Sequence, residues 1–415
     1  MTLTAAVVAV GDELLLGDVV NTNASWLGDQ LRAVGVRVVH SAMVGDDVDR
    51  MVVALRRALD DADVVLVTGG LGPTTDDVTR EGVAAVAGVG LVRRPELELE
   101  LAERFASYSL PMPVEVLRQA DVPEGADVLP NPVGSAPGLR LPVGDRVVYA
   151  LPGPPHELRA VAEPVLAELR KRSGSLLITR TLHCSGAGES SVAGLVQGAV
   201  EVPEGVALSY LASGGVVRVR FTGTTQAVLA PLVDAAAAAL GDLVWGRDDD
   251  TLPGVVAALL LSRGATVGVA ESLTGGLLAA ALTALPGSSS VVRGGLVPYA
   301  TDLKQSLAGV PGPLLSAHGA VSQETAAALA AGARERCGAD YGLATTGVAG
   351  PSEQEGHAVG TVFVAVAGPG GGPGGGPGGG EVRAWQLPGD RDRVRAITVT
   401  LALDLLRRHL VADAL

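Results

Sequence analysis

The sequence is poor in cysteine, aromatic residues and lysine, and each scarcity limits what the chain can be. Two cysteines, Cys184 and Cys337, stand far apart, and neither has a second cysteine nearby with which to form a metal-binding pair. This spacing excludes a disulfide framework and favours two core residues. Aromatic residues make up only 3% of the chain, so its 47% of hydrophobic residues are mainly alanine, valine and leucine. That apolar content still suffices for folded domains.

The chain also lacks long uninterrupted apolar runs and an excess of positive charge. No stretch reaches the roughly 18 apolar residues of a membrane-spanning helix, and the opening MTLTAAVVAV lacks the basic segment of a signal peptide. We therefore expect a cytoplasmic protein without membrane contact. The formal net charge of −14 argues against direct nucleic-acid binding, which requires clustered lysine and arginine. Small molecules are the expected ligands.

Lysine is so scarce that each one needs an explanation. Only Lys171 and Lys304 occur among the 31 basic residues, and all the others are arginine. An arginine keeps its proton near neutral pH, whereas a buried lysine can release it. Lys171 lies in ELRKRSGS at the expected end of a helix, where the helix dipole favours a cation. Lys304 has no such explanation, and we interpret it as a candidate for proton transfer.

The pattern of the 415 residues predicts three domains, since the chain is too long for one core. Residues 1–172 alternate apolar strands with amphipathic helices, which predicts an α/β fold with a parallel sheet. Residues 173–248 predict a small α+β domain with a hairpin that turns at SerGlyGly. We expect this domain to have a structural or dimerisation role, and we expect the protein to be a homodimer. Residues 249–415 return to α/β alternation, and their glycine repeat at 368–380 predicts a flexible hairpin tip without function.

Two loops of the first domain follow apolar strands and carry the residues of a nucleotide site. In a parallel α/β sheet, ligands bind beyond the carboxyl ends of the strands. The loop GDELLLGDVVNTN supplies Asn21 and Asn23. The loop GGLGPTTDD supplies glycines for close approach and carboxylates for a ribose or a metal ion, namely Gly69, Gly70, Gly72, Asp76 and Asp77. The alternative is structural: the glycines form a turn and the aspartates cap a helix that begins near Val78.

The segment AESLTGG places Ser272 between an apolar strand and an alanine- and leucine-rich helix. A serine at a helix start is often only an N-cap. It becomes a nucleophile when a base takes its proton, and Lys304 follows far enough along the chain for a strand and a helix to bring it back beside the serine. If Ser272 lies in the first turn of the helix, the backbone N–H groups of Leu273 and Thr274 would stabilise an oxyanion. Both interpretations stay open at this point.

Short motifs occur along the chain in a characteristic order: GDELLLGDVVNTNASWL, VTGGLGPTTDD, LPNPVGSAPG, ALPGPPHEL, AESLTGG, PGSS, GGLVPYATDLK, TGVAGP and PGDRD. Together they resemble the CinA family, the competence/damage-inducible protein A group, over nearly the whole chain. The resemblance implies an N-terminal three-layer α/β domain similar to molybdopterin-binding domains, with ADP-ribose pyrophosphatase activity. It implies a C-terminal α/β domain similar to nicotinamide mononucleotide amidohydrolases.

The same resemblance implies that Ser272 is the nucleophile and Lys304 its base. It also assigns substrate contacts, with Arg391 as the candidate for the phosphate, to Leu273, Thr274, Gly275, Ser288, Ser289, Tyr299, Thr346, Gly347 and Arg391. The implied reaction is hydrolysis of the carboxamide of nicotinamide mononucleotide to nicotinic acid mononucleotide and ammonia, without a cofactor. Cleavage of ADP-ribose would use a divalent metal ion near Asp76 or Asp77.

These two activities would together salvage pyridine-nucleotide fragments. The alternative class is a non-catalytic pterin- or nucleotide-binding adaptor associated with competence. Ser272 and Lys304 distinguish the two classes, because only the enzyme uses this pair. A non-catalytic adaptor in a lysine-poor chain has no reason to keep Lys304. For the two serines of PGSSS, Ser288 and Ser289, the simpler alternative to a substrate contact is that they only form the turn.

Overall fold

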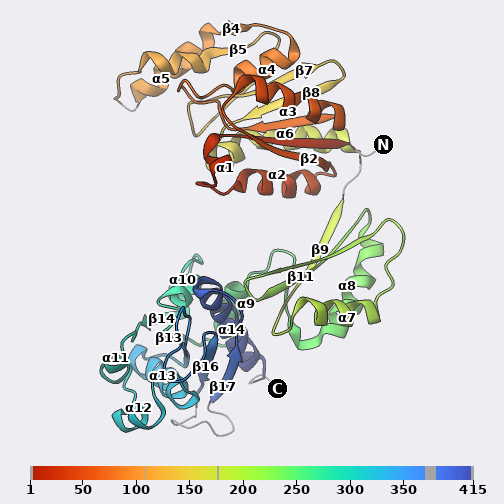
Figure 1. Cartoon of the computed structure of the whole chain (residues 1–415). Coiled ribbons are helices and arrows are strands. Elements are labelled where there is room, and N and C mark those ends of the chain that lie inside the picture. Colours follow the sequence, from red (N-terminus) through yellow and green to blue (C-terminus); the bar gives the residue numbers. More distant parts are fainter. Residues whose placement is uncertain (1–2, 108, 175–176, 370–379, 413–415) are drawn as a thin grey trace. The chain divides into compact units, whose positions relative to one another are not determined.

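The chain forms two compact units, Met1–Ile178 and Thr179–Leu415, shown in Figure 1. This computed structural model describes residues 3–107, 109–174, 177–369 and 380–412. The second unit contains both the expected small α+β segment and the C-terminal segment, so the expected boundary near residue 248 stays a prediction. The greater part of the glycine repeat, residues 370–379, lies outside the described residues.

A six-stranded sheet in the order β2-β1-β3-β8-β7-β6 forms the centre of the first unit. The strands that sequence periodicity predicts are parallel: β1 (Thr4–Val10), β2 (Arg37–Val44), β3 (Val64–Thr68) and β8 (Arg146–Leu151). The sheet continues into an antiparallel edge made of β7 (Gly138–Val143) and β6 (Asp127–Leu129). The chain passes from β2 to β3 across β1, and this switch in strand order places the loops after β1 and β3 side by side.

Helices cover both faces of this sheet because alternate residues of its strands enter two separate cores (Figure 1). In β1, Ala5 and Val7 pack in the core that includes α2 (Thr22–Ala33) and α6 (Pro155–Ser173). Ala6 and Val8 pack in the core on the other face, which includes α3 (Val48–Asp61) and α4 (Thr79–Ala87). The expected three-layer α/β fold is therefore confirmed. The remaining elements are α1 (Asp12–Leu16), β4 (Leu91–Arg93), α5 (Pro95–Ser107), η1 (Val114–Ala120) and β5 (Asp121–Pro123).

The second unit begins with a four-stranded sheet in the order β10-β11-β9-β12. Its elements are β9 (Ile178–Ser185), α7 (Glu189–Ala199), β10 (Ala207–Ser213), β11 (Val216–Gly223), α8 (Gln226–Leu240), η2 (Gly241–Leu243) and β12 (Val244–Arg247). The predicted hairpin is confirmed, since β10 and β11 pair antiparallel around Gly214 and Gly215. By length and composition alone, Gln226–Leu243 could cross a membrane, which is weak support for a membrane segment. The buried residues of α8 instead give it an apolar face that packs with α7 and β11.

A five-stranded sheet in the order β14-β13-β15-β16-β17 forms the rest of the second unit. The strands are β13 (Val267–Glu271), β14 (Val292–Leu296), β15 (Tyr341–Gly347), β16 (Thr361–Ala367) and β17 (Gly380–Gln386), of which the first three run parallel. One face packs against α9 (Leu252–Ser262), α10 (Leu277–Thr283) and α14 (Arg391–Ala412), and the other against α13 (Gln323–Cys337). The shorter elements are η3 (Ser288–Ser290), α11 (Thr301–Ser306) and α12 (Gly312–His318).

Helix α13 lies so close to its neighbours that two positions admit only glycine. A Cβ atom on Gly332 would stand 1.8 Å from the carbonyl oxygen of Ala308, and one on Gly342 would stand 1.9 Å from the carbonyl oxygen of Ala330. Both obstacles are backbone atoms, which cannot rotate away as a side chain can. This close approach holds α13 against β15 and the segment after α11, and so fixes the frame in which Lys304 lies.

We expect Gly332→Ala to lower the free energy of unfolding of the second unit by about 1–3 kcal/mol, because the added methyl group must displace backbone. The control is Gly194→Ala in α7, where nothing lies within 4 Å of the position that the added methyl group would take. This change should be neutral or stabilising by up to about 1 kcal/mol, since alanine favours a helix over glycine. Urea unfolding followed by circular dichroism measures both. Equal midpoints for the two variants would contradict the close packing of α13.

Candidate active site

Ser272 lies at the end of a buried strand and does not cap a helix. Strand β13 ends at Glu271, and the chain then makes a tight turn before α10 begins at Leu277. The N-cap position of α10 is Gly276, which has a left-handed backbone conformation and no side chain to accept a hydrogen bond. Both the N-cap interpretation of Ser272 and its placement in the first helical turn are therefore wrong. The serine stands on the strand-to-helix connection, several residues before the helix.

The group that satisfies the start of α10 is the carboxylate of Glu271. Its oxygens accept hydrogen bonds from the N–H groups of Gly276 (2.9 Å), Leu278 (3.0 Å) and Ala279 (2.8 Å), and the residue is fully buried. A carboxylate in this position also interacts favourably with the helix dipole. This role of Glu271 was not predicted, although an acidic residue shortly before a helix start is a recognisable signal in a sequence. Because Glu271 caps the helix, the hydroxyl of Ser272 is not needed for that purpose.

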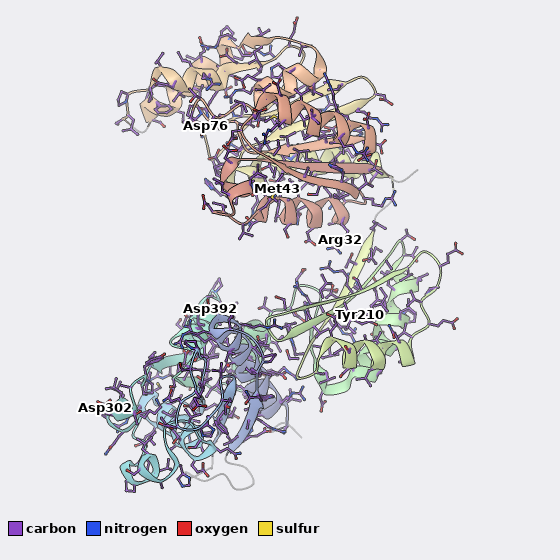
Figure 2. The ribbon with its side chains drawn as sticks, in the orientation of Figure 1. Arg32, Met43, Asp76, Tyr210, Asp302 and Asp392 are labelled. Carbon is purple, nitrogen blue, oxygen red and sulfur yellow. The ribbon has the colours of Figure 1, made fainter. Side chains whose placement is uncertain are left out.

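Lys304 brings its amine to Ser272 from the first turns of α11, as the sequence analysis expected. Its Nζ donates to Ser272 Oγ (3.2 Å), to the carbonyl of Pro298 (3.0 Å) and to the carbonyl of Tyr299 (3.2 Å). The side chain is 2% exposed. Asp302, on the same short helix, is exposed and marks the position of α11 in Figure 2.

Burial lowers the pKa of the Lys304 amine, and the negative charge of Glu355 acts in the opposite direction. All three hydrogen-bond acceptors of the amine are neutral oxygens, so none of them compensates a full positive charge as a carboxylate would. The environment therefore favours the neutral amine relative to a lysine in water. A neutral amine within hydrogen-bond distance of a serine hydroxyl can accept its proton.

Arg395, from α14, binds the backbone of the two residues that follow Ser272. Its Nε donates to the carbonyl of Leu273 (3.0 Å) and its Nη2 to the carbonyl of Thr274 (3.1 Å). In the described part of the chain, the N–H groups of these two residues make no hydrogen bond. They keep the donor capacity that the sequence analysis expected for an oxyanion. Arg395 itself was not predicted, because its contacts join positions 122 and 121 residues apart.

A cavity of about 100 Å³ opens beside the Ser272–Lys304 pair, and most of the predicted substrate residues line it. Those that do so are Leu273, Tyr299, Thr346, Gly347 and Arg391, together with the catalytic pair itself. Arg391 donates to the Tyr299 hydroxyl (2.6 Å) and to the carbonyl of Gly350 (2.7 Å), and both side chains are exposed at the mouth. The hydroxyl of the buried Thr346 donates to the carbonyl of Ala320 (2.7 Å), so this threonine holds the wall in place.

Four predicted substrate residues do not line this cavity. The buried Thr274 shares a hydrogen bond with Thr345, 2.8 Å between the two Oγ1 atoms, so its side chain belongs to the core. Gly275 lies in the turn before α10, outside the cavity wall. Ser288 and Ser289 form the short helix η3 and stay outside as well, which agrees with the simpler interpretation of PGSSS as a turn.

The first unit has a separate cavity of about 220 Å³ at the carboxyl ends of β1 and β3. Of the predicted nucleotide-site residues, Asn21, Asn23, Gly69, Gly70, Asp76 and Asp77 line it, whereas Gly72 does not. Asn21 caps α2 by accepting from the N–H of Ala24 (3.0 Å). The amide of Asn23 donates to the carbonyl of Gly153 (2.7 Å), which joins α2 to the loop after β8. The cavity therefore lies where the strand order predicts it. Asn21 and Asn23 make hydrogen bonds that stabilise its walls.

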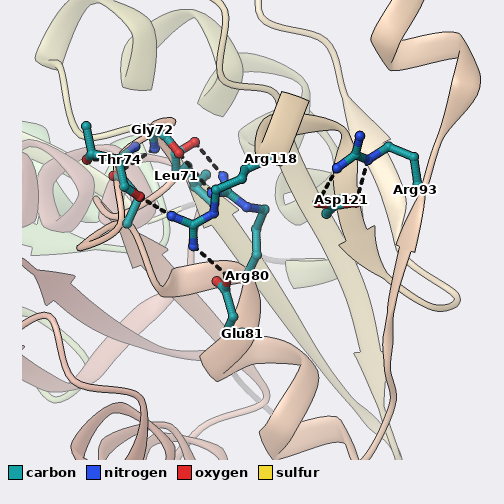
Figure 3. Close-up of polar contacts among 9 residues, drawn as sticks. Leu71, Gly72, Thr74, Arg80, Glu81, Arg93, Arg118 and Asp121 are labelled. Atoms are coloured by element: carbon teal, nitrogen blue, oxygen red, sulfur yellow. Dashed lines mark hydrogen bonds and ion pairs between the residues drawn. The ribbon is translucent and has the colours of Figure 1, made fainter. Parts of the chain in front are cut away.

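The loop after β3 is held in place by hydrogen bonds within the loop and by hydrogen bonds from two arginines outside it. Asp77 accepts from the N–H groups of Gly72 and Thr74 (both 2.8 Å). Behind the loop, the buried Arg80 donates to the carbonyls of Leu71 (2.6 Å) and Gly72 (2.8 Å), as Figure 3 shows. Arg118 donates to the carbonyl of Thr74 and to Glu81 (Figure 3). Helix α4 has Val78 as its N-cap residue, without a side-chain hydrogen bond, so the expected aspartate cap is wrong.

The carboxylates at this cavity do not gather into a set of three metal ligands within the described residues. Within the described residues, no three His, Cys, Asp or Glu side chains are placed to hold a metal ion together. The oxygens of Asp77 are already used by the loop, and Asp76 is exposed at the edge of the unit (Figure 2). Burial and the nearby charges of Asp12, Glu13 and Asp76 raise the pKa of Asp46 on the same wall. A divalent metal ion near Asp76 or Asp77 stays a prediction, and we derive no metal-dependent step here.

Comparisons with known proteins agree with the two regions described above. Residues 249–410 match the family model described as CinA C-terminal domain, and residues 6–171 match the one described as probable molybdopterin binding domain. A CinA-like protein of Frankia casuarinae is 50% identical, over 98% of this chain and 96% of its own length. A putative competence-damage inducible protein of Symbiobacterium thermophilum is 43% identical, over 99% of both chains.

Among solved structures, the protein CinA from Thermoplasma acidophilum is 37% identical, covers 40% of this chain and 98% of its own, and gives a TM-score of 0.38.

We expect Glu271→Gln to destabilise the start of α10, because an uncharged amide offers one acceptor oxygen to three N–H groups. The loss should be about 1–3 kcal/mol. Hydrogen exchange of the Gly276, Leu278 and Ala279 amides measures it locally, and these amides should exchange faster in the variant. The control is Glu335→Gln, an exposed glutamate of α13. Unchanged exchange at the three amides would contradict the capping role.

Proposed function

The chain belongs to the CinA family, and on that premise we propose that its C-terminal α/β region hydrolyses the carboxamide of nicotinamide mononucleotide. The products are nicotinic acid mononucleotide and ammonia. The observation that carries the proposal is the contact between Ser272 Oγ and Lys304 Nζ, 3.2 Å apart in a buried position at the base of a cavity. A nucleophile and a base within hydrogen-bond reach are the minimum that amide hydrolysis through an acyl-enzyme requires.

The proposed reaction has two steps that use the same two side chains. Ser272 Oγ attacks the carboxamide carbon while Lys304 accepts the hydroxyl proton. Lys304 then gives that proton to the amide nitrogen, the C–N bond breaks and ammonia leaves. Water, with Lys304 again as the base, cleaves the serine ester and releases the carboxylate product. The N–H groups of Leu273 and Thr274, whose carbonyls are bound by Arg395, supply the donors for the developing oxyanion.

In this proposal, Arg391 binds the phosphate of the nucleotide. It is an exposed arginine at the cavity mouth, and its guanidinium group holds Tyr299 and the carbonyl of Gly350. A phosphate binds well to such a planar group of N–H donors. The cavity of about 100 Å³ at the serine suits the planar carboxamide end of a nucleotide and leaves the phosphate outside, near Arg391.

Several expectations about the whole chain stay predictions. Pyrophosphatase activity on ADP-ribose has no favouring observation in the first unit, since the expected metal ligands do not converge in the described residues. We place the protein in the cytoplasm as a homodimer on the grounds given by the sequence. The adaptor alternative also stays open, and the Ser272–Lys304 pair is the feature that it leaves unexplained.

We expect Ser272→Ala to lower ammonia release from nicotinamide mononucleotide by at least about 1,000-fold, because the nucleophile is lost. Lys304→Arg should lower it by at least about 100-fold, because a guanidinium group does not accept the proton. Lys171→Arg is the matched control, since it changes the only other lysine of the chain and should leave the rate unchanged. The measurement is ammonia production by the full-length protein. No activity in the wild type, or full activity in Ser272→Ala, would reject the amidase.

The value of kcat/KM should rise with pH as Lys304 loses its proton. Burial lowers the Lys304 pKa, so this rise should occur below 10.5, the ordinary pKa of a lysine. The negative charge of Glu355 raises the same pKa, and Glu355→Gln should therefore move the rise to lower pH. Glutamine can still accept from the N–H groups of Ala320 and Val321, which Glu355 now holds at 2.7 and 3.2 Å. Glu353→Gln, an exposed change in the same loop, is the control. A shift to higher pH would contradict this assignment.

A further inference from the structure

The first unit leaves one edge of its sheet open. Strand β2 has β1 as its only neighbour in the six-stranded order, and no described strand pairs with its outer side. Proteins usually protect an edge strand with charged side chains or proline, because its free N–H and C=O groups can pair with another chain. Residues 38–44, VVHSAMV, supply no proline and no permanently charged side chain. Their one ionisable side chain, that of His40, lies 3.3 Å from a carboxylate oxygen of Asp61. The outer edge of β2 is therefore a candidate for pairing with another strand.

Apolar side chains are exposed along this edge and beside its end. Met43, labelled in Figure 2, is 51% exposed, although it belongs to a strand. Helix α1 contacts β2 and buries none of its residues, and its Leu16 is 76% exposed. Together these side chains form what we call the β2–α1 patch: Leu15, Leu16, Val19, Val20, Val39 and Met43. Exposed apolar side chains gathered in one place are typical of a surface that binds another protein.

The two ends of β2 carry opposite charges. Arg37, at the start of the strand, is exposed, and its side chain makes no hydrogen bond or ion pair with another described residue. Asp46 follows the end of the strand, and burial together with the charges of Asp12, Glu13 and Asp76 raises its pKa. The carboxylates at this end therefore lack a cation that would neutralise them, and Arg37 lacks an anion. Each end of the edge needs a partner of the opposite charge.

A second copy of the same edge meets this need only in the antiparallel direction. Arg37 of each copy then lies beside Asp46 of the other, whereas a parallel pair would place like charges side by side. The two positions stand symmetrically about the peptide between Ser41 and Ala42, so the pairing has a two-fold axis there and closes on itself. The acidic ends of the two copies would lie about 30 Å apart at the usual rise per strand residue. That distance exceeds the screening length of about 8 Å in physiological salt, so their repulsion is weak.

We propose that the outer edge of β2 binds the β2 edge of a second copy of this chain, antiparallel about a two-fold axis beside Ser41. Backbone hydrogen bonds between the two edges join the two six-stranded sheets into one, as in other complexes formed by strand addition. The β2–α1 patches of both copies lie beside this junction. The proposal gives the expected homodimer a surface in the first unit, outside residues 173–248, and it is independent of the amidase reaction in the other unit.

Disulfide trapping in the full-length protein tests this surface directly. Facing residues of antiparallel strands have Cα atoms about 4.5–5.5 Å apart, within the range of a disulfide. Mild oxidation of Ser41→Cys at micromolar concentration should therefore give a covalent dimer. The control is Ser107→Cys, an exposed change at the end of α5, which should form the dimer at least about 10-fold more slowly. The native cysteines, Cys184 and Cys337, both lie in the other unit and are present in each variant.

A charge placed on the edge should prevent the trapping. Adding Met43→Lys to Ser41→Cys puts one lysine of each copy close to the two-fold axis, and like charges that face each other across strands oppose pairing. The rate of disulfide formation should fall by at least about 10-fold, which corresponds to about 1.4 kcal/mol. The matched control is Val53→Lys in the same background, an exposed change on α3 that should leave the rate unchanged. Circular dichroism checks that both lysine variants are folded.

Three outcomes would overturn the proposal. The first is that Ser41→Cys forms the covalent dimer no faster than Ser107→Cys. The second is that Met43→Lys slows the trapping no more than Val53→Lys does. The third is that the wild-type protein sediments as a monomer at micromolar concentration. A dimer held through residues 173–248 would give the first outcome while sedimenting as a dimer, so the trapping experiment distinguishes the two surfaces.

Discussion

The candidate site of the second unit depends on one costly arrangement, the burial of the Lys304 amine among neutral oxygens. An ammonium group that loses its water without gaining a carboxylate is destabilised relative to the neutral amine. Ser272, Pro298 and Tyr299 supply hydrogen-bond acceptors but no charge. Arginine could not fill this position in the same way, because its guanidinium group stays protonated. This explains why a chain with only two lysines has one of them here.

Two charged residues beside this pair act on the backbone and not on the reacting atoms. Glu271 satisfies three N–H groups at the start of α10, and Arg395 takes two carbonyls of the preceding turn. Between them they fix the orientation of peptide groups in the segment that follows Ser272. The serine hydroxyl is thereby released from capping, and the N–H groups after it remain available. Without Glu271 and Arg395, the polar side chains of this strand-to-helix connection would be needed for capping. With these two residues in place, the connection can present its polar side chains to a ligand.

The sequence was sufficient for the fold and for the central pair, since both follow from patterns that are local or compositional. Apolar periodicity predicts β1, β3 and β13, and the scarcity of lysine points to Lys304. The contact of Arg395 was out of reach because it joins segments more than 100 residues apart. The saturation of Asp77 by the N–H groups of its own loop was also hidden, because a carboxylate in sequence does not reveal which donors face it. Ser288 and Ser289 matched a motif, but η3 holds them outside the cavity.

What separates structural from functional polar residues in both units is whether their hydrogen bonds are already made. Asn23 and Asp77 lie at the cavity of the first unit, yet their side chains are already hydrogen-bonded to neighbouring residues, so they build its walls. Lys304, by contrast, keeps a buried amine with no carboxylate among its hydrogen-bond partners. Folding pays for each such deficit, and a protein retains one where a ligand or a reaction recovers the loss. The same reasoning therefore selects the serine–lysine pair of the second unit as the functional feature of its cavity.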